Sequence, residues 1–174
     1  MFKIFYPTEY YDSTYSIDFK EYYKSGYRGV IFDIDNTLVE HDAPADFRAS
    51  VLIKKLMAMG YKVCFLSNND EQRVADFNKE FGATYIYKAG KPLAKGYIKA
   101  MKKMGTDKDN TLFVGDQLFT DICGANRSRI RSVLVAPMAP EKDTLGVSLK
   151  RPLEKIVFRS WKKQQGQRTL QKNS

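Results

Sequence analysis

The stretch Gly29-Val30-Ile31-Phe32-Asp33-Ile34-Asp35-Asn36-Thr37-Leu38 decides the fold. Its apolar run, Val30–Asp33, is typical of a strand that is buried on both faces of a sheet. Two aspartates stand at alternate positions, and residues i and i+2 of an extended chain point to the same side. We therefore expect the carboxylates of Asp33 and Asp35 to project together from the end of a buried strand, while Ile34 points away.

Strands and helices alternate after this stretch. Apolar runs predict further strands at Lys62–Leu66, Thr84–Tyr87, Thr111–Val114 and Ser132–Ala136. Helical spacing and glycine stops predict intervening helices on Val51, Leu52, Leu56 and Met59, on Val74, Phe77 and Phe81, from Pro92 to Met104, and over Thr120–Arg127. The alternation predicts a three-layer α/β sandwich with a mainly parallel, Rossmann-like sheet. We expect the tyrosine-rich residues 1–29 to form loop and short helix over one sheet edge.

Polar residues follow each of the first four predicted strands. In a parallel sheet the carboxyl ends of the strands meet at one edge, and ligands bind there. The residues that reach this edge are Asp33, Asp35 and Thr37 after the first strand, Ser67 and Asn68 after the second, Lys91 after the third, and Asp116 and Asp121 after the fourth. The sequence thus predicts a site that combines carboxylates, a hydroxyl group and a lysine.

These residue types suit phosphoryl transfer. Neighbouring carboxylates repel one another unless a cation lies between them or one is protonated. Mg²⁺ takes one or two carboxylates together with substrate phosphate, so Asp33 and Asp116, with Asp35 as a further candidate, predict a magnesium site. A neutralised Asp33 can attack phosphorus, and Asp35 can protonate the leaving oxygen and later deprotonate water.

The remaining polar residues suit a bound phosphate. Ser67 offers a hydroxyl donor, and Lys91 offers a positive charge close to a predicted helix N-terminus. Thr37 and Asn68 are further candidates for phosphate contact, and Asp121 can orient Lys91 or bind the metal through water. Each short motif alone is common in solvated loops and turns. Their occurrence in order, at four strand ends, is what favours a functional site.

With these motifs the sequence resembles the haloacid dehalogenase (HAD) superfamily of phosphatases. The resemblance covers about residues 28–136 and rests on Val30–Leu38, on Ser67 after a strand, on Lys91, and on Gly115-Asp116 followed by Asp121. It implies that Asp33 is the nucleophile, Asp35 the acid/base and Asp116 a metal ligand.

The amino-acid sequences of the motifs are similar to those of one branch, the subfamily IIIA phosphatases of the bacterial YqeG type. The similar segments are Asp33–Val39, Ser67-Asn68-Asn69, Lys91-Pro92 and Gly115–Asp121. That branch is related to mitochondrial phosphatidylglycerophosphate phosphatases, so the resemblance implies a lipid phosphate as substrate.

The spacing of the motifs leaves no room for a cap domain. Thr37 and Ser67 are 30 residues apart, and Ser67 and Lys91 are 24 residues apart. Each interval is filled by one predicted helix and its loops, whereas a domain needs about 50 residues or more. We expect residues 1–174 to form a single domain with an open cleft, which suits a phosphate carried on a large molecule.

The net charge of +9 is concentrated at the C-terminal end. Residues 150–174 carry eight Lys or Arg against one acid, Glu154. Pro152 can begin a helix with an apolar face of Leu153, Ile156, Val157 and Trp161. Apolar and basic faces together are the pattern of a helix that lies on an anionic membrane. Two other interpretations stay open: the apolar stripe packs on the domain, or the segment is a solvated tail.

Composition and motifs together favour a cytoplasmic enzyme, peripheral at a membrane. No apolar run approaches the roughly 20 residues of a membrane span, and two cysteines predict no disulfide framework. The favoured function is a Mg²⁺-dependent phosphatase of a lipid phosphate such as phosphatidylglycerophosphate. The alternatives are a soluble sugar or nucleotide phosphate as substrate, or a non-catalytic, phosphate-dependent module on RNA or ribosomes. We expect a membrane partner in preference to nucleic acid.

Overall fold

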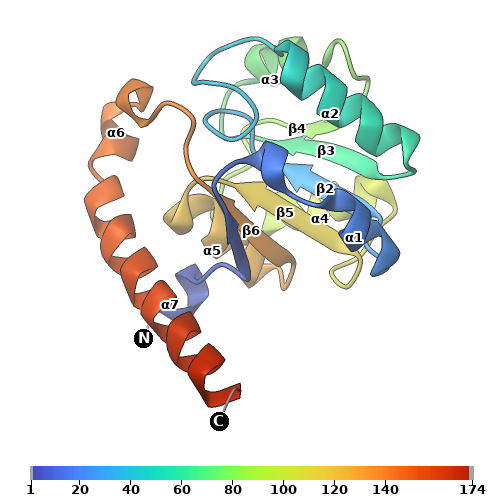
Figure 1. Ribbon diagram of the computed structural model, residues 1–174. Coiled ribbons are helices and arrows are strands. Elements are labelled where there is room, and N and C mark those ends of the chain that lie inside the picture. Colours follow the sequence, from blue (N-terminus) through green and yellow to red (C-terminus); the bar gives the residue numbers. More distant parts are fainter. Residues whose placement is uncertain (1, 173–174) are drawn as a thin grey trace.

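A parallel sheet of six strands forms the centre of the molecule (Figure 1). The structure, a computed structural model, describes residues 2–172, with side chains described through residue 166. The strand order is β1-β6-β5-β2-β3-β4. The strands are β1 (Glu9–Tyr11), β2 (Gly29–Phe32), β3 (Lys62–Leu66), β4 (Thr84–Ile86), β5 (Thr111–Gly115) and β6 (Arg131–Val135). The predicted fold class and all five predicted strands are confirmed.

The N-terminal segment contains a strand that the sequence analysis missed. β1 pairs parallel with β6 at the sheet edge, with Tyr10 beside Leu134. The expectation of loop and helix alone was therefore incomplete, because a three-residue edge strand leaves no periodic pattern. The rest of this segment contains η1 (Lys3–Phe5), η2 (Thr14–Ser16) and α1 (Phe19–Lys24).

Helices cover both faces of the sheet (Figure 1). The helical elements after β2 are α2 (Phe47–Ala58), α3 (Glu71–Asn78), α4 (Ala94–Met104), the π-helical turn η3 (Leu118–Ile122), α5 (Cys123–Arg127), η4 (Pro140–Lys142), α6 (Leu145–Ser148) and α7 (Arg151–Lys172). Asp46 and Asp70 begin α2 and α3, since each carboxylate accepts a backbone N–H of the first turn. α4 begins two residues after Pro92, so the prediction that Pro92 opens this helix was wrong. Leu93 is its extended N-cap.

Alternation along β2 builds two separate cores. Val30 and Phe32 pack into the cluster that includes Ile53, Leu56 and Phe77 of α2 and α3. Ile31 points to the other face, into the cluster that includes Tyr97 and Met101 of α4. Because both faces of β2 are covered, its carboxyl end is held rigidly between layers.

Helix α7 packs on the domain along only part of its apolar surface. Val157 and Trp161 are 5% and 8% exposed, whereas Leu153 and Ile156 are 57% and 58% exposed. Of the four residues of the predicted apolar stripe, only Val157 and Trp161 therefore pack on the domain. The helix is turned so that Arg151, Glu154, Val157 and Trp161, spaced by three or four residues, face the domain.

None of the helices in the described part of the chain is long and apolar enough to cross a membrane.

Candidate active site

Three functional side chains stand side by side because their strands do. Asp33 follows β2, Ser67 follows β3 and Asp116 follows β5. β2 lies between the other two strands, with Phe32 beside Phe65 on one side and Val114 on the other. The backbone N–H of Asp33 continues this ladder, donating to the Val114 carbonyl oxygen at 2.9 Å.

A buried group of carboxylates surrounds Lys91. The ammonium group donates to Asp33 Oδ1 at 2.5 Å and to Asp121 Oδ1 at 2.7 Å. Carboxylate oxygens of Asp33, Asp116 and Asp121 all lie within 4.8 Å of one another. Thr37 Oγ1 links two of them, at 3.3 Å from Asp33 Oδ2 and 3.4 Å from Asp116 Oδ1. All five residues are buried.

The electrostatics of this group favour an added cation. Burial raises the pKa of the Asp33 carboxyl group to about 7, although Lys91 acts against this shift. Burial, followed by repulsion from Asp121 and Asp33, raises the pKa of Asp116 well above its usual range. Burial lowers the pKa of Lys91, but the attraction of Asp121 and Asp33 outweighs it and the net shift is upward. The carboxylates are thus incompletely compensated, and a divalent cation would stabilise their ionised forms.

Asp121 is fixed as the partner of Lys91. Its Oδ2 accepts the backbone N–H groups of Asp116 at 3.1 Å and Gln117 at 3.0 Å. This requires glycine at position 115, since a Cβ there would lie 2.6 Å from the same oxygen. Asp121 itself lies in the π-helical turn η3, a rare conformation that is frequent at functional sites.

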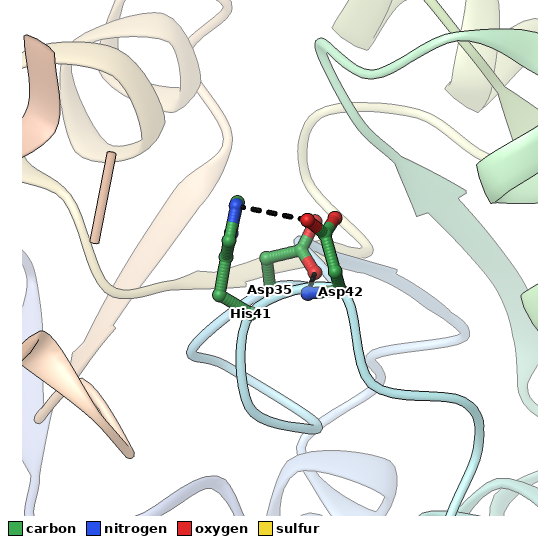
Figure 2. Close-up of side chains that lie close together, drawn as sticks. All are labelled: Asp35, His41 and Asp42. Atoms are coloured by element: carbon green, nitrogen blue, oxygen red, sulfur yellow. Dashed lines mark hydrogen bonds and ion pairs between the residues drawn. The ribbon is translucent and has the colours of Figure 1, made fainter. Parts of the chain in front are cut away.

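Asp35 lines the same pocket as Asp33 but belongs to a different polar group. Its Oδ2 accepts from Asn69 at 2.6 Å, and its Oδ1 accepts from Arg73 at 2.8 Å and from the Asp42 backbone at 2.8 Å. Figure 2 shows Asp35 beside Asp42, whose carboxylate lies 3.3 Å from His41 Nε2. The structure therefore does not bring the Asp35 carboxylate into the buried group around Lys91.

Two loops after β3 and β4 are joined at the phosphate-binding candidates. Asn68 Oδ1 accepts the Lys91 backbone N–H at 2.8 Å, and Asn68 Nδ2 donates to the Lys91 carbonyl oxygen at 3.2 Å. Ser67 Oγ accepts the Asn69 N–H at 3.1 Å, which leaves its own proton to donate elsewhere. Asn68 thus sets the position of Lys91 relative to Ser67.

The pocket above these residues has a volume of about 240 Å³. Its floor includes Asp33, Ser67 and Lys91. One wall comes from the segment before α7, through Asp143, Thr144, Val147 and Lys150. The interval from Thr37 to Ser67 holds α2 and β3, and the interval from Ser67 to Lys91 holds α3 and β4. The spacing of the motifs did not predict that the C-terminal segment borders the pocket.

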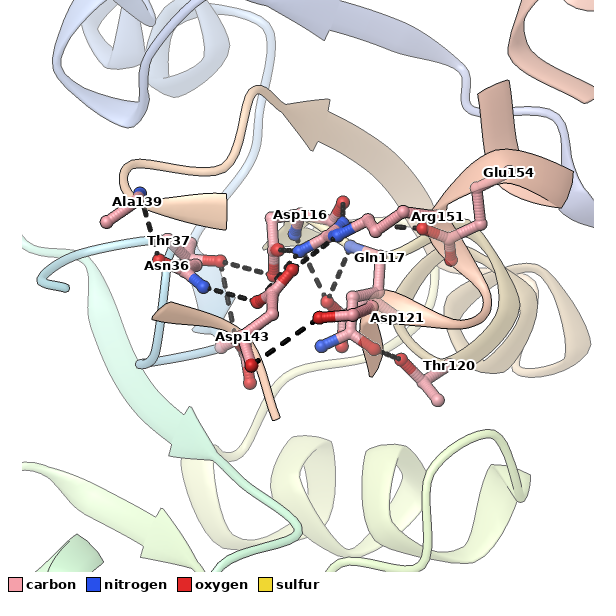
Figure 3. Close-up of polar contacts among 12 residues, drawn as sticks. Asn36, Thr37, Asp116, Gln117, Thr120, Asp121, Ala139, Asp143, Arg151 and Glu154 are labelled. Atoms are coloured by element: carbon pink, nitrogen blue, oxygen red, sulfur yellow. Dashed lines mark hydrogen bonds and ion pairs between the residues drawn. The ribbon is translucent and has the colours of Figure 1, made fainter. Parts of the chain in front are cut away.

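Two arginines near the site were also missed by sequence reasoning. Arg73, in the first turn of α3, pairs with Asp35. Arg151, the first residue of α7, pairs with Asp116 Oδ2 at 2.5 Å and with Asp143 Oδ2 at 2.8 Å (Figure 3). The available signal for Arg151 was Glu154, a single acid in a basic segment and three residues further along the helix.

Comparisons with known proteins identify similar hydrolases and phosphatases. A family model described as haloacid dehalogenase-like hydrolase matches residues 48–128. A Bacillus subtilis protein described as the probable phosphatase YqeG is 35% identical over 162 residues, covering 92% of this chain and 94% of the relative. The Arabidopsis thaliana phosphatidylglycerophosphate phosphatase 1, chloroplastic/mitochondrial, is 27% identical over 156 residues. It is matched over 83% of this chain and 44% of its own length.

A solved structure shares the fold. The cobalt-bound deoxy-D-mannose-octulosonate 8-phosphate phosphatase YrbI from Haemophilus influenzae aligns with a TM-score of 0.53 and 17% identity, over 78% of this chain and 90% of that chain.

The sheet order, the carboxylates at the strand ends and these relatives define the class of the molecule: it is a phosphatase, a hydrolase of phosphoric monoesters. Within that class, the chain belongs to the haloacid dehalogenase-like hydrolase family and is similar to YqeG over nearly its whole length.

Proposed function

We propose that the chain is a Mg²⁺-dependent phosphatase that forms an aspartyl-phosphate on Asp33 and acts on a lipid-borne phosphate. The observation that carries the mechanism is the placement of Asp33. It is a buried carboxylate on the pocket floor, 2.5 Å from the Lys91 ammonium and within 4.8 Å of Asp116. A nucleophile, a counter-charge and a second carboxylate therefore meet at one point.

The residues of the buried group fit magnesium. Their donors are carboxylate oxygens, the ligands that this hard cation prefers. Asp33 and Asp116 would hold the ion, while both oxygens of Asp121 are already engaged by Lys91 and by backbone N–H groups. A bound Mg²⁺ would neutralise charge on the carboxylates and on the phosphoryl group. We assign Asp35 to proton transfer, because its carboxylate lies outside this group.

The reaction then proceeds in two balanced steps. An oxygen of Asp33 attacks phosphorus and forms an acyl phosphate, while the bond from phosphorus to the ester oxygen breaks. Asp35, as the acid, gives its proton to that leaving oxygen. Asp35 next takes a proton from water, whose oxygen attacks phosphorus. The bond between phosphorus and Asp33 breaks, which releases inorganic phosphate and regenerates the carboxylate.

Ser67, Lys91, Thr37 and Asn68 form the proposed cradle for the phosphoryl group. Ser67 Oγ can donate a hydrogen bond, and Lys91 supplies a fixed positive charge. Thr37 lies between Asp33 and Asp116, and Asn68 acts by holding the backbone of Lys91.

Two observations support a lipid substrate. The relatives include the Arabidopsis phosphatidylglycerophosphate phosphatase, although the chain spans less than half of its length. In addition, the C-terminal segment that borders the pocket carries four exposed apolar side chains, here called the apolar strip, at Leu145, Leu149, Leu153 and Ile156. Acyl chains at the mouth of the pocket could lie along this strip.

A phosphate-release panel tests the proposed function. With Mg²⁺ present, we expect kcat/KM for phosphatidylglycerophosphate in mixed micelles to exceed that for sugar phosphates and nucleoside monophosphates by about tenfold or more, since apolar contacts discriminate by such factors. Chelation with EDTA should remove activity on every substrate. A panel with no Mg²⁺-dependent release would contradict the mechanism, and release from soluble esters alone would contradict only the lipid substrate.

The apolar strip also suits contact with an anionic membrane. Exposed bases accompany it at Lys150, just before α7, and at Lys155, Arg159 and Lys163 on α7. Basic residues near an anionic leaflet contribute about 1 kcal/mol each. We propose that the outer side of α6 and α7 rests on such a surface and presents the pocket to lipid phosphates.

Replacing Leu153 and Ile156 by serine should weaken binding to vesicles of phosphatidylglycerol and phosphatidylcholine by on the order of tenfold or more, because each apolar side chain contributes about 1.5–3 kcal/mol when fully buried. Co-sedimentation measures the change. The matched control is Ile98→Ser on α4, where the isoleucine is 55% exposed, close to the 58% of Ile156. Equal sedimentation of the double variant, the control and the wild type would contradict this membrane surface.

A further inference from the structure

The first residue of α7 reaches back into the active site. Arg151 donates from Nη2 to Asp116 Oδ2 at 2.5 Å and from Nη1 to the Asp116 carbonyl oxygen at 3.1 Å. Its Nε donates to Asp143 Oδ2 at 2.8 Å, and Nη1 also lies 3.3 Å from Glu154 Oε2 (Figure 3). One guanidinium group thus holds three carboxylates and a carbonyl oxygen, and one of those carboxylates is the proposed metal ligand.

The partners of Arg151 are among the least accessible acids of the protein. The side chains of Asp116, Asp143 and Glu154 are 0%, 3% and 7% exposed, and that of Arg151 is 14% exposed. Charge-assisted hydrogen bonds in such a site are short and directional, and a planar guanidinium group fixes the orientation of a carboxylate that it contacts.

Asp143 and Glu154, the other two carboxylates that Arg151 contacts, are themselves held by further hydrogen bonds. Asp143 Oδ1 accepts from Asn36 Nδ2 at 2.6 Å, and Asn36 Oδ1 accepts the Ala139 N–H at 3.1 Å. Glu154 Oε1 accepts the Phe119 N–H at 2.9 Å. The C-terminal segment is therefore bound to Asn36, in the loop after β2, and to Phe119 of η3, the turn that follows β5.

This arrangement divides the two oxygens of Asp116 between different tasks. Oδ2 is held by Arg151, whereas Oδ1 lies 3.4 Å from Thr37 Oγ1, which in turn contacts Asp33. We propose that Arg151 is a positioning residue of the phosphatase: it aims Asp116 Oδ1 toward Asp33 for metal binding and so makes α7 part of the active site. This inference rests on the proposed function, because it assigns a task to the supporting side of the same metal site.

Three full-length variants test the inference. Arg151→Gln removes the charge and the planar guanidinium group, and Arg151→Lys keeps the charge without that planar group. Arg48→Gln is the matched control, at an exposed Arg–Asp pair in which Arg48 of α2 contacts Asp46. The readout is the Mg²⁺ concentration that gives half of the Mg²⁺-induced rise in melting temperature, which is independent of turnover. The second readout is kcat and KM for an aryl phosphate at saturating Mg²⁺.

For Arg151→Gln we expect the half-saturating Mg²⁺ concentration to rise by about 10- to 100-fold, as for other partners that orient metal ligands. kcat should fall more than KM rises, because the phosphate contacts of Ser67 and Lys91 remain. Arg151→Lys should recover only a small part of the loss, since one ammonium cannot bridge the Asp116 and Asp143 carboxylates. Arg48→Gln should match the wild type in both readouts.

Several results would overturn the inference. One is a folded Arg151→Gln protein with an unchanged or lower half-saturating Mg²⁺ concentration, even if its melting temperature is reduced. Full recovery by Arg151→Lys would show that charge alone matters. If Arg151→Gln gives no cooperative melting transition, Arg151→Lys decides by the same Mg²⁺ criterion. If the melting temperature of the wild type does not change when Mg²⁺ is added, the proposed metal site is overturned, and this inference with it.

Discussion

Replacing Asp33 by asparagine should abolish phosphate release while the protein remains folded. An amide oxygen does not attack phosphorus, and loss of the nucleophile from a covalent mechanism lowers turnover by on the order of 10⁴-fold or more. Asparagine keeps the shape of the side chain, its oxygen can still accept from Lys91, and its NH₂ group can donate to Thr37 Oγ1, whose own proton then goes to Asp116. Turnover of an aryl phosphate with Mg²⁺ measures the loss.

The fold of this variant should not be weakened at pH 8 without Mg²⁺. Burial raises the pKa of Asp33 from its usual value near 4 to about 7 in the folded protein. The folded state therefore binds this proton more tightly than the unfolded state, and stability falls as pH rises through that window. Because a neutral amide avoids this loss, we expect a melting temperature at pH 8 in EDTA equal to or above that of the wild type.

The matched control for this experiment is Asp109→Asn, in an exposed turn before β5 at the opposite end of the sheet. It should keep full activity and the Mg²⁺-induced rise in melting temperature, both of which Asp33→Asn should lose. Near-normal turnover by Asp33→Asn would contradict the nucleophile assignment.

The positions of the strand ends were predictable from the sequence because they depend on local signals. Val30–Phe32 and Lys62–Leu66 are apolar runs of strand length, and parallel pairing then brings their carboxyl ends to one edge. Asp33, Ser67 and Lys91 meet there as expected. The mutual position of Asp33 and Asp35 was less predictable, because Asn36 adopts a left-handed conformation with φ of 62° and the chain turns immediately after the pair.

The contribution of α7 could not be predicted, because it arises from contacts distant in sequence. Arg151 meets Asp116, which lies 35 residues earlier, and no periodic pattern connects the two. Helical spacing placed an apolar stripe on α7 but not its rotation. That rotation follows the buried ion pairs of Arg151 and Glu154, which turn Leu153 and Ile156 outward. In this helix, polar contacts at the active site decide which apolar residues remain exposed.

Replacing Asp35 by asparagine should slow turnover by an amount that depends on the leaving group. A positioned general acid contributes about 10²–10⁴-fold, and most to poor leaving groups, which need a proton as they depart. We expect the loss in kcat to approach the upper figure for an alkyl phosphate such as glycerol phosphate. It should be at least about tenfold smaller for an activated aryl phosphate, whose oxygen departs without protonation.

The hydrogen-bond partners of Asp35 can accommodate an asparagine, so the change in turnover will report the loss of the carboxyl group. An asparagine there can accept from Arg73 and from the Asp42 N–H through its oxygen, and a flip of the Asn69 amide would satisfy the new NH₂ group. Its carboxylate lies outside the group of Asp33, Asp116 and Asp121, so an ion held by Asp33 and Asp116 would not require it as a ligand. The half-saturating Mg²⁺ concentration of Asp35→Asn should therefore stay at the wild-type value, with Asp109→Asn again as the control.

Two results would contradict the role given to Asp35. Equal losses in kcat on the alkyl and aryl phosphates would mean that the residue does not protonate the leaving oxygen. A raised half-saturating Mg²⁺ concentration, with the fold intact, would mean that the carboxylate serves the metal site. Because Arg73 and Asn69 hold both Asp35 oxygens in the structure, the second result would also require that this group rearranges when the ion binds. The leaving-group dependence and the metal titration thus test the two possible tasks of one carboxylate independently.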